Sequence, residues 1–241
     1  MVARPLLADE PPSATPYRPT VSNPADLPTP GWLELEWGAQ RDKTDGAHEV
    51  SWPYLFKYAF TPEWGVLLGG DAYVRATSTD GSSTSGFGDT ELSLKHRIPV
   101  TDDEAFGVEA GVRLPTAKTG LGSDKTDCIL KGIFSRDVAT VHLDINLGPT
   151  RIGAPEPGTG RLAWNGSAAL STNLNAGWGM TGELSGTRRQ GTAAQSQLLF
   201  AVTYAANKRT VFDVGFAKGL TDASQDYTIF AGITTMLGRL H

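Results

Sequence analysis

The sequence predicts an all-β protein: a transmembrane, antiparallel up-and-down β-barrel of about 12 strands, preceded by a flexible Pro-rich extension. Three observations predict it. Glycine accounts for 28 of 241 residues and hydrophobic residues for only 39%, whereas a typical soluble domain has about 7% Gly and roughly 45–50% apolar residues. Beyond residue 30, apolar and polar residues alternate in segments of about ten residues. The connections between these segments alternate between short and long.

Composition excludes several classes of protein. Lys and Arg total 21 against 26 Asp and Glu, so no basic field is present to bind phosphates and we expect no nucleic-acid partner. Cys128 is the single cysteine and cannot form an intrachain disulfide. The four histidines and this thiol show no metal-ligand spacing, so we expect neither a metal nor another cofactor. No run approaches 18 apolar residues, which excludes a transmembrane helix.

Residues 1–30 are rich in Pro, Ser and Ala and predict a flexible N-terminal extension. The apolar patch at 5–8 is too short for a signal-peptide core, so we expect an export signal to be missing from this sequence or already removed. Two other roles for this segment stay open: contact with a periplasmic partner, or entry into the barrel lumen as a plug.

Residues 31–241 form the expected barrel domain. Its strands are predicted at 31–40, 48–60, 64–76, 87–98, 105–114, 126–136, 138–148, 161–171, 176–187, 195–206, 209–219 and 226–238. Long connections are expected at 41–47, 77–86, 115–125, 149–160, 188–194 and 220–225, with tight turns between the remaining pairs. This alternation places all long loops at one end of the barrel and both termini with the tight turns, by convention on the periplasmic side.

The two faces of each segment separate cleanly. In 138–148 the odd positions are apolar, including Val141, Leu143 and Ile145, and the even positions include His142 and Asp144. Segment length also matches the roughly 9–11 residues of a tilted strand that crosses a bilayer core, whereas soluble strands have about 5–6. An apolar outer face and a polar lumen, closed on an even number of strands, leave no unpaired edge in lipid.

Short motifs resemble an outer-membrane barrel family, the one named for the meta-pathway of phenol degradation. They are Gly86-Phe87-Gly88-Asp89-Thr90, then Leu114-Pro115-Thr116 with Gly120, Gly122-Ser123, Asp127 and Lys131, and finally Phe212-Asp213-Val214-Gly215 with Asp226 and Gly232. The resemblance covers roughly 31–241. It implies a bacterial outer-membrane transporter that passes small organic solutes, aromatic or otherwise apolar, by passive diffusion, with outer-membrane lipid and the insertion machinery as partners.

The chain departs from the family pattern at two places. Ala117 stands where the family has Gly, which alters a loop. The chain ends Leu237-Gly238-Arg239-Leu240-His241 instead of on an aromatic residue, which weakens the insertion signal.

Alternation places a set of charged side chains in the lumen: Glu34, Glu36, Lys57, Asp71, Arg75, Asp89, Glu91, Lys95, Arg97, Glu109, Arg113, Asp127, Lys131, His142, Asp144, Glu183 and Asp213, together with Tyr73. Their signs are mixed. They either pair across strands and hold the register, or a subset lines a narrow path. Whether the lumen is open or plugged, and the oligomeric state, stay undecided at this level.

We expect no enzymatic activity. The leading alternative is a lipid-modifying enzyme, with His142 and Ser93 as candidate base and nucleophile and Asp144 beside them. A structural barrel without transport and a soluble all-β binding module are further alternatives. Cys128 is expected to face lipid as an inert apolar residue. Lateral exit into lipid is a further expectation for Gly177, Gly179 and Gly215, where the wall lacks side chains.

Overall fold

The computed structural model describes residues 12–240 as a closed antiparallel barrel of 12 long strands and one short one. The strands are β1 (Trp32–Thr44), β2 (Ala47–Ala59), β3 (Trp64–Thr77), β4 (Ser83–Gly86), β5 (Thr90–Pro99), β6 (Glu104–Leu114), β7 (Asp127–Val138), β8 (Val141–Arg151), β9 (Leu162–Asn173), β10 (Trp178–Arg189), β11 (Gln195–Asn207), β12 (Thr210–Gly219) and β13 (Tyr227–Arg239). No helix in this part of the chain is long and apolar enough to cross a membrane.

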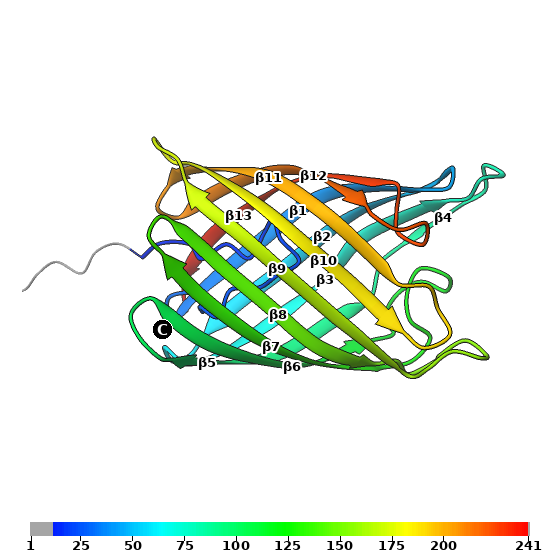
Figure 1. The fold of residues 1–241 in the computed structure, drawn as a ribbon, viewed down its shortest axis with the longest axis horizontal. Coiled ribbons are helices and arrows are strands. Elements are labelled where there is room, and N and C mark those ends of the chain that lie inside the picture. Colours follow the sequence, from blue (N-terminus) through cyan, green and yellow to red (C-terminus); the bar gives the residue numbers. More distant parts are fainter. Residues whose placement is uncertain (1–11, 241) are drawn as a thin grey trace, which may run out of the picture.

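Closure follows from the strand pairing. Each long strand pairs with its neighbours in sequence, and β1 also pairs with β13, so that no long strand is left at an edge. β4 is the exception: it adds four residues to the rim by pairing with the end of β3. Figure 1 shows the long loops gathered at one end and the tight turns with the C-terminus at the other, as alternation predicts.

Burial is inverted relative to a soluble protein. Large apolar side chains such as Leu147, Leu170 and Phe200 are more than half exposed. Several charged side chains, among them Lys57, Lys95 and Glu34, have no exposed surface. In a closed barrel these two faces are the outer wall and the lumen, so the outer face suits lipid and the interior is polar. The predicted fold is therefore confirmed.

The first hairpin differs from the prediction of a long connection at 41–47. β1 and β2 run on to Thr44 and Ala47, and the turn consists of Asp45 and Gly46 alone. Both residues have positive φ, 45° and 85°, which is the conformation of a type I′ hairpin turn and explains the Asp-Gly pair. The wall is consequently taller at this hairpin than alternation alone indicates.

A bulge in β3 corrects two predicted lumen positions. Ser51 pairs with Val74 and Pro53 with Asp71, so Ala72 and Tyr73 both lie opposite Trp52. Because side chains alternate with a period of two, the bulge shifts the rest of β3 by one position. Val74 is consequently buried and Arg75 is exposed.

Tyr73 belongs to the outer wall for the same reason. Its ring lies 5.8 Å from that of Trp52, whose side chain is 47% exposed. Arg75 and Tyr73 were both expected in the lumen, and the bulge places them outside it.

Candidate functional site: the lumen and the segment that crosses it

The described part of the extension, residues 12–31, lies inside the barrel rather than trailing from it (Figure 1). The chain enters at the tight-turn end, where the N–H of Ala14 donates to the carbonyl of Lys208 at 2.8 Å. It returns to the same end, where the N–H of Gly31 donates to the carbonyl of Ala59 at 2.8 Å. Of the roles left open for the extension, this arrangement corresponds to entry into the lumen as a plug. Residues 1–11 of the predicted extension lie outside the described residues. We call residues 12–31 the lumen segment.

Wall carboxylates hold the backbone of the lumen segment. Glu36 accepts from the N–H groups of Tyr17 at 2.7 Å and Arg18 at 3.1 Å. Glu183 accepts from the N–H groups of Val21 at 3.1 Å and Ser22 at 2.7 Å. Since these carboxylates are almost fully buried, the backbone donors supply the hydrogen bonds that bulk water would otherwise make.

Tyr17 is the centre of this contact. Its ring lies between two lysines, with Lys57 Nζ 4.2 Å and Lys95 Nζ 4.1 Å from the ring centroid. Lys95 Nζ also donates to the Tyr17 hydroxyl at 2.8 Å, and that hydroxyl donates to the carbonyl of Asp26 at 2.7 Å. Burial, reinforced by nearby carboxylates including Glu109, raises the pKa of Tyr17 well above its usual range. The phenol therefore stays protonated and can serve as this donor.

Wall carboxylates pair with both lysines. Lys57 Nζ lies 3.1 Å from Glu34 Oε2 and 2.7 Å from Glu36 Oε1. Lys95 Nζ lies 3.3 Å from Glu109 Oε1. Removing one partner of such buried pairs is costly because an uncompensated charge remains.

Arg18 is seated by glycines of the wall. Its guanidinium makes a bidentate pair with Asp213, with both N–O distances at 3.0 Å. The group lies against Gly38 and Gly232, where an added Cβ would come within 2.7 and 2.3 Å of it. The absence of side chains at these two positions makes the close approach possible.

The tip of the lumen segment contacts the opposite wall. Asn23 donates from Nδ2 to both oxygens of Glu109 at 2.9 Å and from its N–H to Asn146 Oδ1 at 2.8 Å. The N–H of Ala25 donates to Ser135 Oγ at 2.7 Å. Contacts on β1, β6, β8, β10 and β12 together mean that the segment crosses the lumen rather than following one side of it.

Cavities remain on both sides of the lumen segment. Two cavities of about 620 Å³ each lie towards the long-loop end and share Glu91, Arg113 and Lys131 as lining residues. One of about 690 Å³ lies towards the tight-turn end, lined by Thr15 to Thr20 of the segment and by His142. We call the first two cavities together the outer vestibule and the third the inner vestibule. Val21 and Asn23 line the outer vestibule and Arg18 the inner one, so the segment separates them.

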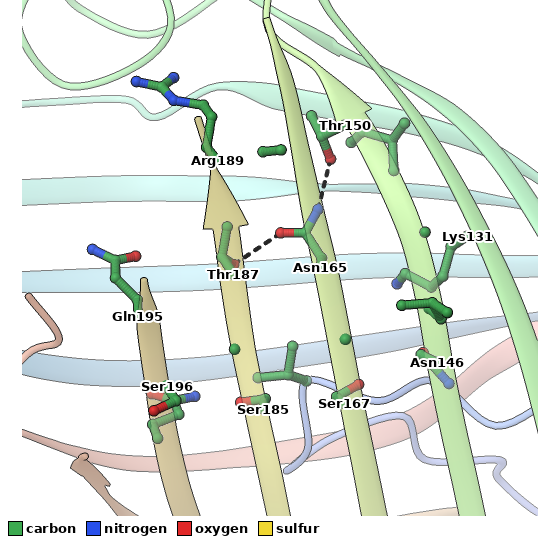
Figure 2. Close-up of a pocket in the computed structure, with 18 of the residues that line it drawn as sticks. Lys131, Asn146, Thr150, Asn165, Ser167, Ser185, Thr187, Arg189, Gln195 and Ser196 are labelled. Carbon is green, nitrogen blue, oxygen red and sulfur yellow. Dashed lines mark hydrogen bonds between the residues drawn. The ribbon is translucent and has the colours of Figure 1, made fainter. Parts of the chain in front are cut away.

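Figure 2 shows the part of the outer vestibule formed by β8 to β11. Apart from Lys131 and Arg189, the side chains labelled there are neutral hydrogen-bonding groups. Asn165 is central, donating to Thr150 Oγ1 at 3.1 Å and accepting from Thr187 Oγ1 at 2.9 Å. Asn165 and Ser167 thus face the lumen from β9.

The charges that line the outer vestibule are paired. Arg113 lies 3.3 Å from Glu91 and 3.6 Å from Asp127, and Lys131 lies 3.3 Å from Glu109. Arg189, the third cation that lines it, pairs with Glu156 of the loop between β8 and β9. Each of these cations is therefore offset by a carboxylate, which reduces the field available to select ions of one sign.

The structure distributes the predicted lumen residues as follows. Buried are Glu34, Glu36, Lys57, Lys95, Glu109, Asp127, Asp144, Glu183 and Asp213. Partly exposed are Asp71, Glu91, Arg97, Arg113, Lys131 and His142. Arg75 is outside the lumen. Asp89 lies in the connection before β5, where it accepts from the N–H groups of Ala117 and Ser123 and so ties the loop at 115–126 to the rim.

The catalytic pair considered for a lipid-modifying enzyme does not meet. Both ring nitrogens of His142 face carboxylates, Nδ1 at 2.6 Å from Asp137 and Nε2 at 3.1 Å from Asp144. Ser93 is on β5, separated from β8 by β6 and β7. His142 therefore has no ring nitrogen free to activate Ser93 in this arrangement.

The expected lateral exit at Gly177, Gly179 and Gly215 finds no opening. The β10–β11 ladder is continuous from Trp178 to Thr187, and an added Cβ at Gly215 would meet Phe230 at 2.4 Å. Gly177 lies in a turn with φ of 85°. Glycine thus serves turns and close packing at these positions.

Solved structures of known proteins share this architecture. An outer-membrane channel from Pseudomonas putida F1 is similar with a TM-score of 0.71 and 12% identity, over 88% of this chain and 98% of that one. The NanC porin gives a TM-score of 0.61 and 8% identity, over 85% and 100%. The KdgM porin gives 0.57 and 12%, over 85% and 99%.

The chain has the fold of a bacterial outer-membrane β-barrel channel. At these identities the likeness shows the fold and nothing finer. No protein-family model matches the sequence, and no curated protein matches it.

The residues that sequence reasoning missed belong to the lumen segment: Tyr17, Arg18, Ser22, Asn23 and Asp26. One signal was available, because Tyr17 is the only aromatic residue among the first 30. An isolated aromatic beside an arginine in a Pro-rich stretch is a reason to look for a docking site on the rest of the chain.

Proposed function

We propose that this protein is a channel of the bacterial outer membrane for small organic solutes, and that the lumen segment controls its conductance. The observation that carries this proposal is that residues 12–31 lie between the outer and inner vestibules and line both. Cavities remain on both sides of the segment, so its release is expected to open a path between the two vestibules. A 12-stranded lumen is intermediate between a filled 8-stranded barrel and an open 16-stranded porin.

The solute class rests on two supports. The resemblance to the family named for the meta-pathway of phenol degradation favours small aromatic or apolar molecules. The lining of the outer vestibule favours an uncharged solute, because the cations there are paired with carboxylates and much of the remaining lining consists of hydroxyl and amide groups. One similar porin is described in complex with disordered oligogalacturonate, and an acidic solute of that kind is the contrasting case for this chain.

A reversible tether tests the control by the lumen segment. Ser22 Oγ and Ser167 Oγ lie 2.8 Å apart, so the pair Ser22→Cys and Ser167→Cys can form a disulfide that locks the segment to β9. The background is Cys128→Ser, which removes the chain's own exposed thiol. We expect low single-channel conductance when the pair is oxidised and a larger, noisier conductance after reduction.

The Ser22→Cys variant alone, treated with the same oxidant and reductant, is the control. Equal conductance in the oxidised and reduced states of the double variant would contradict control by the segment. Liposome swelling with phenol-sized neutral solutes, neutral sugars and uronic acids then ranks the solutes. Absence of swelling with all three in a folded, reduced barrel would contradict the channel itself.

A further inference from the structure

A cluster of cations lies on the outer wall at the long-loop end of the barrel. Its members are Arg41 and Lys43 on β1, Arg75 on β3 and Lys218 on β12. Arg41, Arg75 and Lys218 are exposed and Lys43 is partly exposed. Val74 and Ala217, which directly precede Arg75 and Lys218, are buried and face the lumen, so the two cations face outward. We call these four residues the outer basic cluster.

The strand register brings the four cations together although they span 178 residues of sequence, from 41 to 218. Lys218 and Lys43 both pair with Tyr227, one from each side of β13. One row closer to the middle of the barrel, Arg41 pairs with Val50, and Val50 pairs with Arg75. Strands are about 4.8 Å apart, so the cations in each row are about 10 Å apart.

These cations have no anionic partner among the described residues. Within that part of the chain none of the four is within 4.0 Å of a carboxylate, whereas Lys57, Lys95 and Arg113 in the lumen all are. Lys43 Nζ lies 5.8 Å from the centroid of the Tyr227 ring, and Lys218 Nζ donates to the carbonyl of Asp226 at 2.8 Å. Their charge is thus held near the wall and left without a counter-charge.

Apolar side chains adjoin the cations on the same wall, because Phe216 pairs with Ile229 and Ile229 pairs with Arg41. Phe216 is 45% exposed, Ile229 is 51% exposed and Trp52 is 47% exposed, and they lie on β12, β13 and β2. Cations beside an exposed apolar surface match a lipid with an anionic headgroup and acyl chains.

We propose that the outer basic cluster binds the phosphorylated headgroup of lipopolysaccharide. Long loops face the cell exterior in barrels of this kind, and the outer leaflet there consists of lipopolysaccharide, whose lipid A disaccharide carries phosphate groups. Two arginines supply bidentate donors for phosphate oxygens and two lysines supply point charges. The acyl chains lie along Phe216, Ile229 and Trp52.

A charge-matched pair of variants tests this. Arg41→Gln/Arg75→Gln removes two cations of the cluster. Arg151→Gln/Arg188→Gln removes two exposed arginines at the same end of the barrel, on β8 and β10. Heat-modifiable gel mobility verifies that each variant is folded. Binding of purified rough-type lipopolysaccharide to the detergent-solubilised protein is then measured by titration and by native mass spectrometry.

At about fivefold per cation near an anionic headgroup, we expect the cluster variant to bind roughly 20- to 30-fold more weakly. We expect the control variant to stay within about threefold of the parent protein, and dephosphorylated lipopolysaccharide to bind the parent as weakly as intact lipopolysaccharide binds the cluster variant. Equal weakening in both variants, unchanged binding in the cluster variant, or equally tight binding of phosphatidylglycerol vesicles would each overturn the proposal.

Discussion

Single residues determine how the lumen segment is held. The Tyr17 hydroxyl accepts a hydrogen bond from Lys95, and the ammonium groups of Lys57 and Lys95 lie on the two sides of its ring. One aromatic side chain therefore contacts lysines from both β2 and β5. Gly38 and Gly232 contribute by lacking a side chain, since the Arg18 guanidinium occupies the space that a Cβ would need. Neither effect is visible in a composition or in a hydropathy pattern.

Replacing Gly232 is expected to release Arg18 from Asp213. In Gly232→Ala the new Cβ would lie 2.3 Å from Arg18 Nε, and the strand cannot retreat because its neighbours on β1 and β12 hold it. Loss of a charge-assisted bidentate pair weakens docking of the segment by about 1.5–3 kcal/mol. Single-channel recording should show larger conductance or more frequent openings.

Gly238→Ala is the matched control, because Gly238 is on the same strand and a Cβ added there would meet nothing within 4 Å. We expect this variant to conduct like the parent. Identical traces for Gly232→Ala and Gly238→Ala would contradict the role given to Arg18.

Elements differ in how well pattern alone located them. The strand at 138–148 was predicted within three residues of β8, because its two faces alternate without interruption. The first turn was not, since its strands extend to Asp45 and Gly46 with polar residues that resemble a loop. The strand at 64–76 was located to within one residue of β3, but the faces of Tyr73 and Arg75 were not, since a bulge opposite Trp52 depends on the pairing partner and leaves no mark in the alternation of β3 itself.

The loop at 115–126 depends on Asp89 in the preceding connection. Burial opposes ionisation of Asp89, but donors from the Ser123 N–H, the Ser123 hydroxyl and the Ala117 N–H outweigh it and lower the pKa of this carboxyl. A lowered pKa in the folded state means that the contact is complete above the ordinary aspartate value of about 3.9 and is lost as pH falls towards the lowered value. The protection factor of the Ser123 N–H, which corrects the exchange rate for the intrinsic rate at each pH, should therefore fall below about pH 4.

Asp89→Asn is expected to show the lower protection already at neutral pH, because its single amide oxygen cannot replace both carboxylate oxygens, one of which accepts from Ala117 and the other from Ser123. Asp124→Asn lies in the same loop and is the control for local charge. Slow exchange at Ser123 in Asp89→Asn would refute the tether.

At the scale of the whole molecule, inverted burial makes the barrel stable only when a membrane or detergent covers its wall. The exposed side chains of Leu147, Leu170 and Phe200 would make the protein poorly soluble in water. Inside the barrel, the buried charges are compensated by one another and by hydrogen bonds from the lumen segment. The same inversion explains the low hydrophobic share, because one side of each strand is polar.

The orientation in the membrane follows from the two kinds of connection. We expect a protease-cleavable tag inserted at 156–158, in the long loop between β8 and β9, to be cut on intact cells. The same tag at 101–103, in the tight turn between β5 and β6, should be protected until the outer membrane is permeabilised. Cleavage at 101–103 with protection at 156–158 would reverse the orientation and move the outer basic cluster to the other leaflet.

The sequence by itself determined the barrel, its 12 long strands, the alternation of loop lengths and most of the inward faces, because alternation with a period of two is local and survives in any register. Only the tertiary structure decided that the lumen segment crosses the barrel, that Arg75 faces outward and that four distant cations form one cluster. These depend on partners separated by up to 195 residues, as in Arg18 and Asp213. Such contacts arise from strand order and closure, and no short-range pattern encodes them.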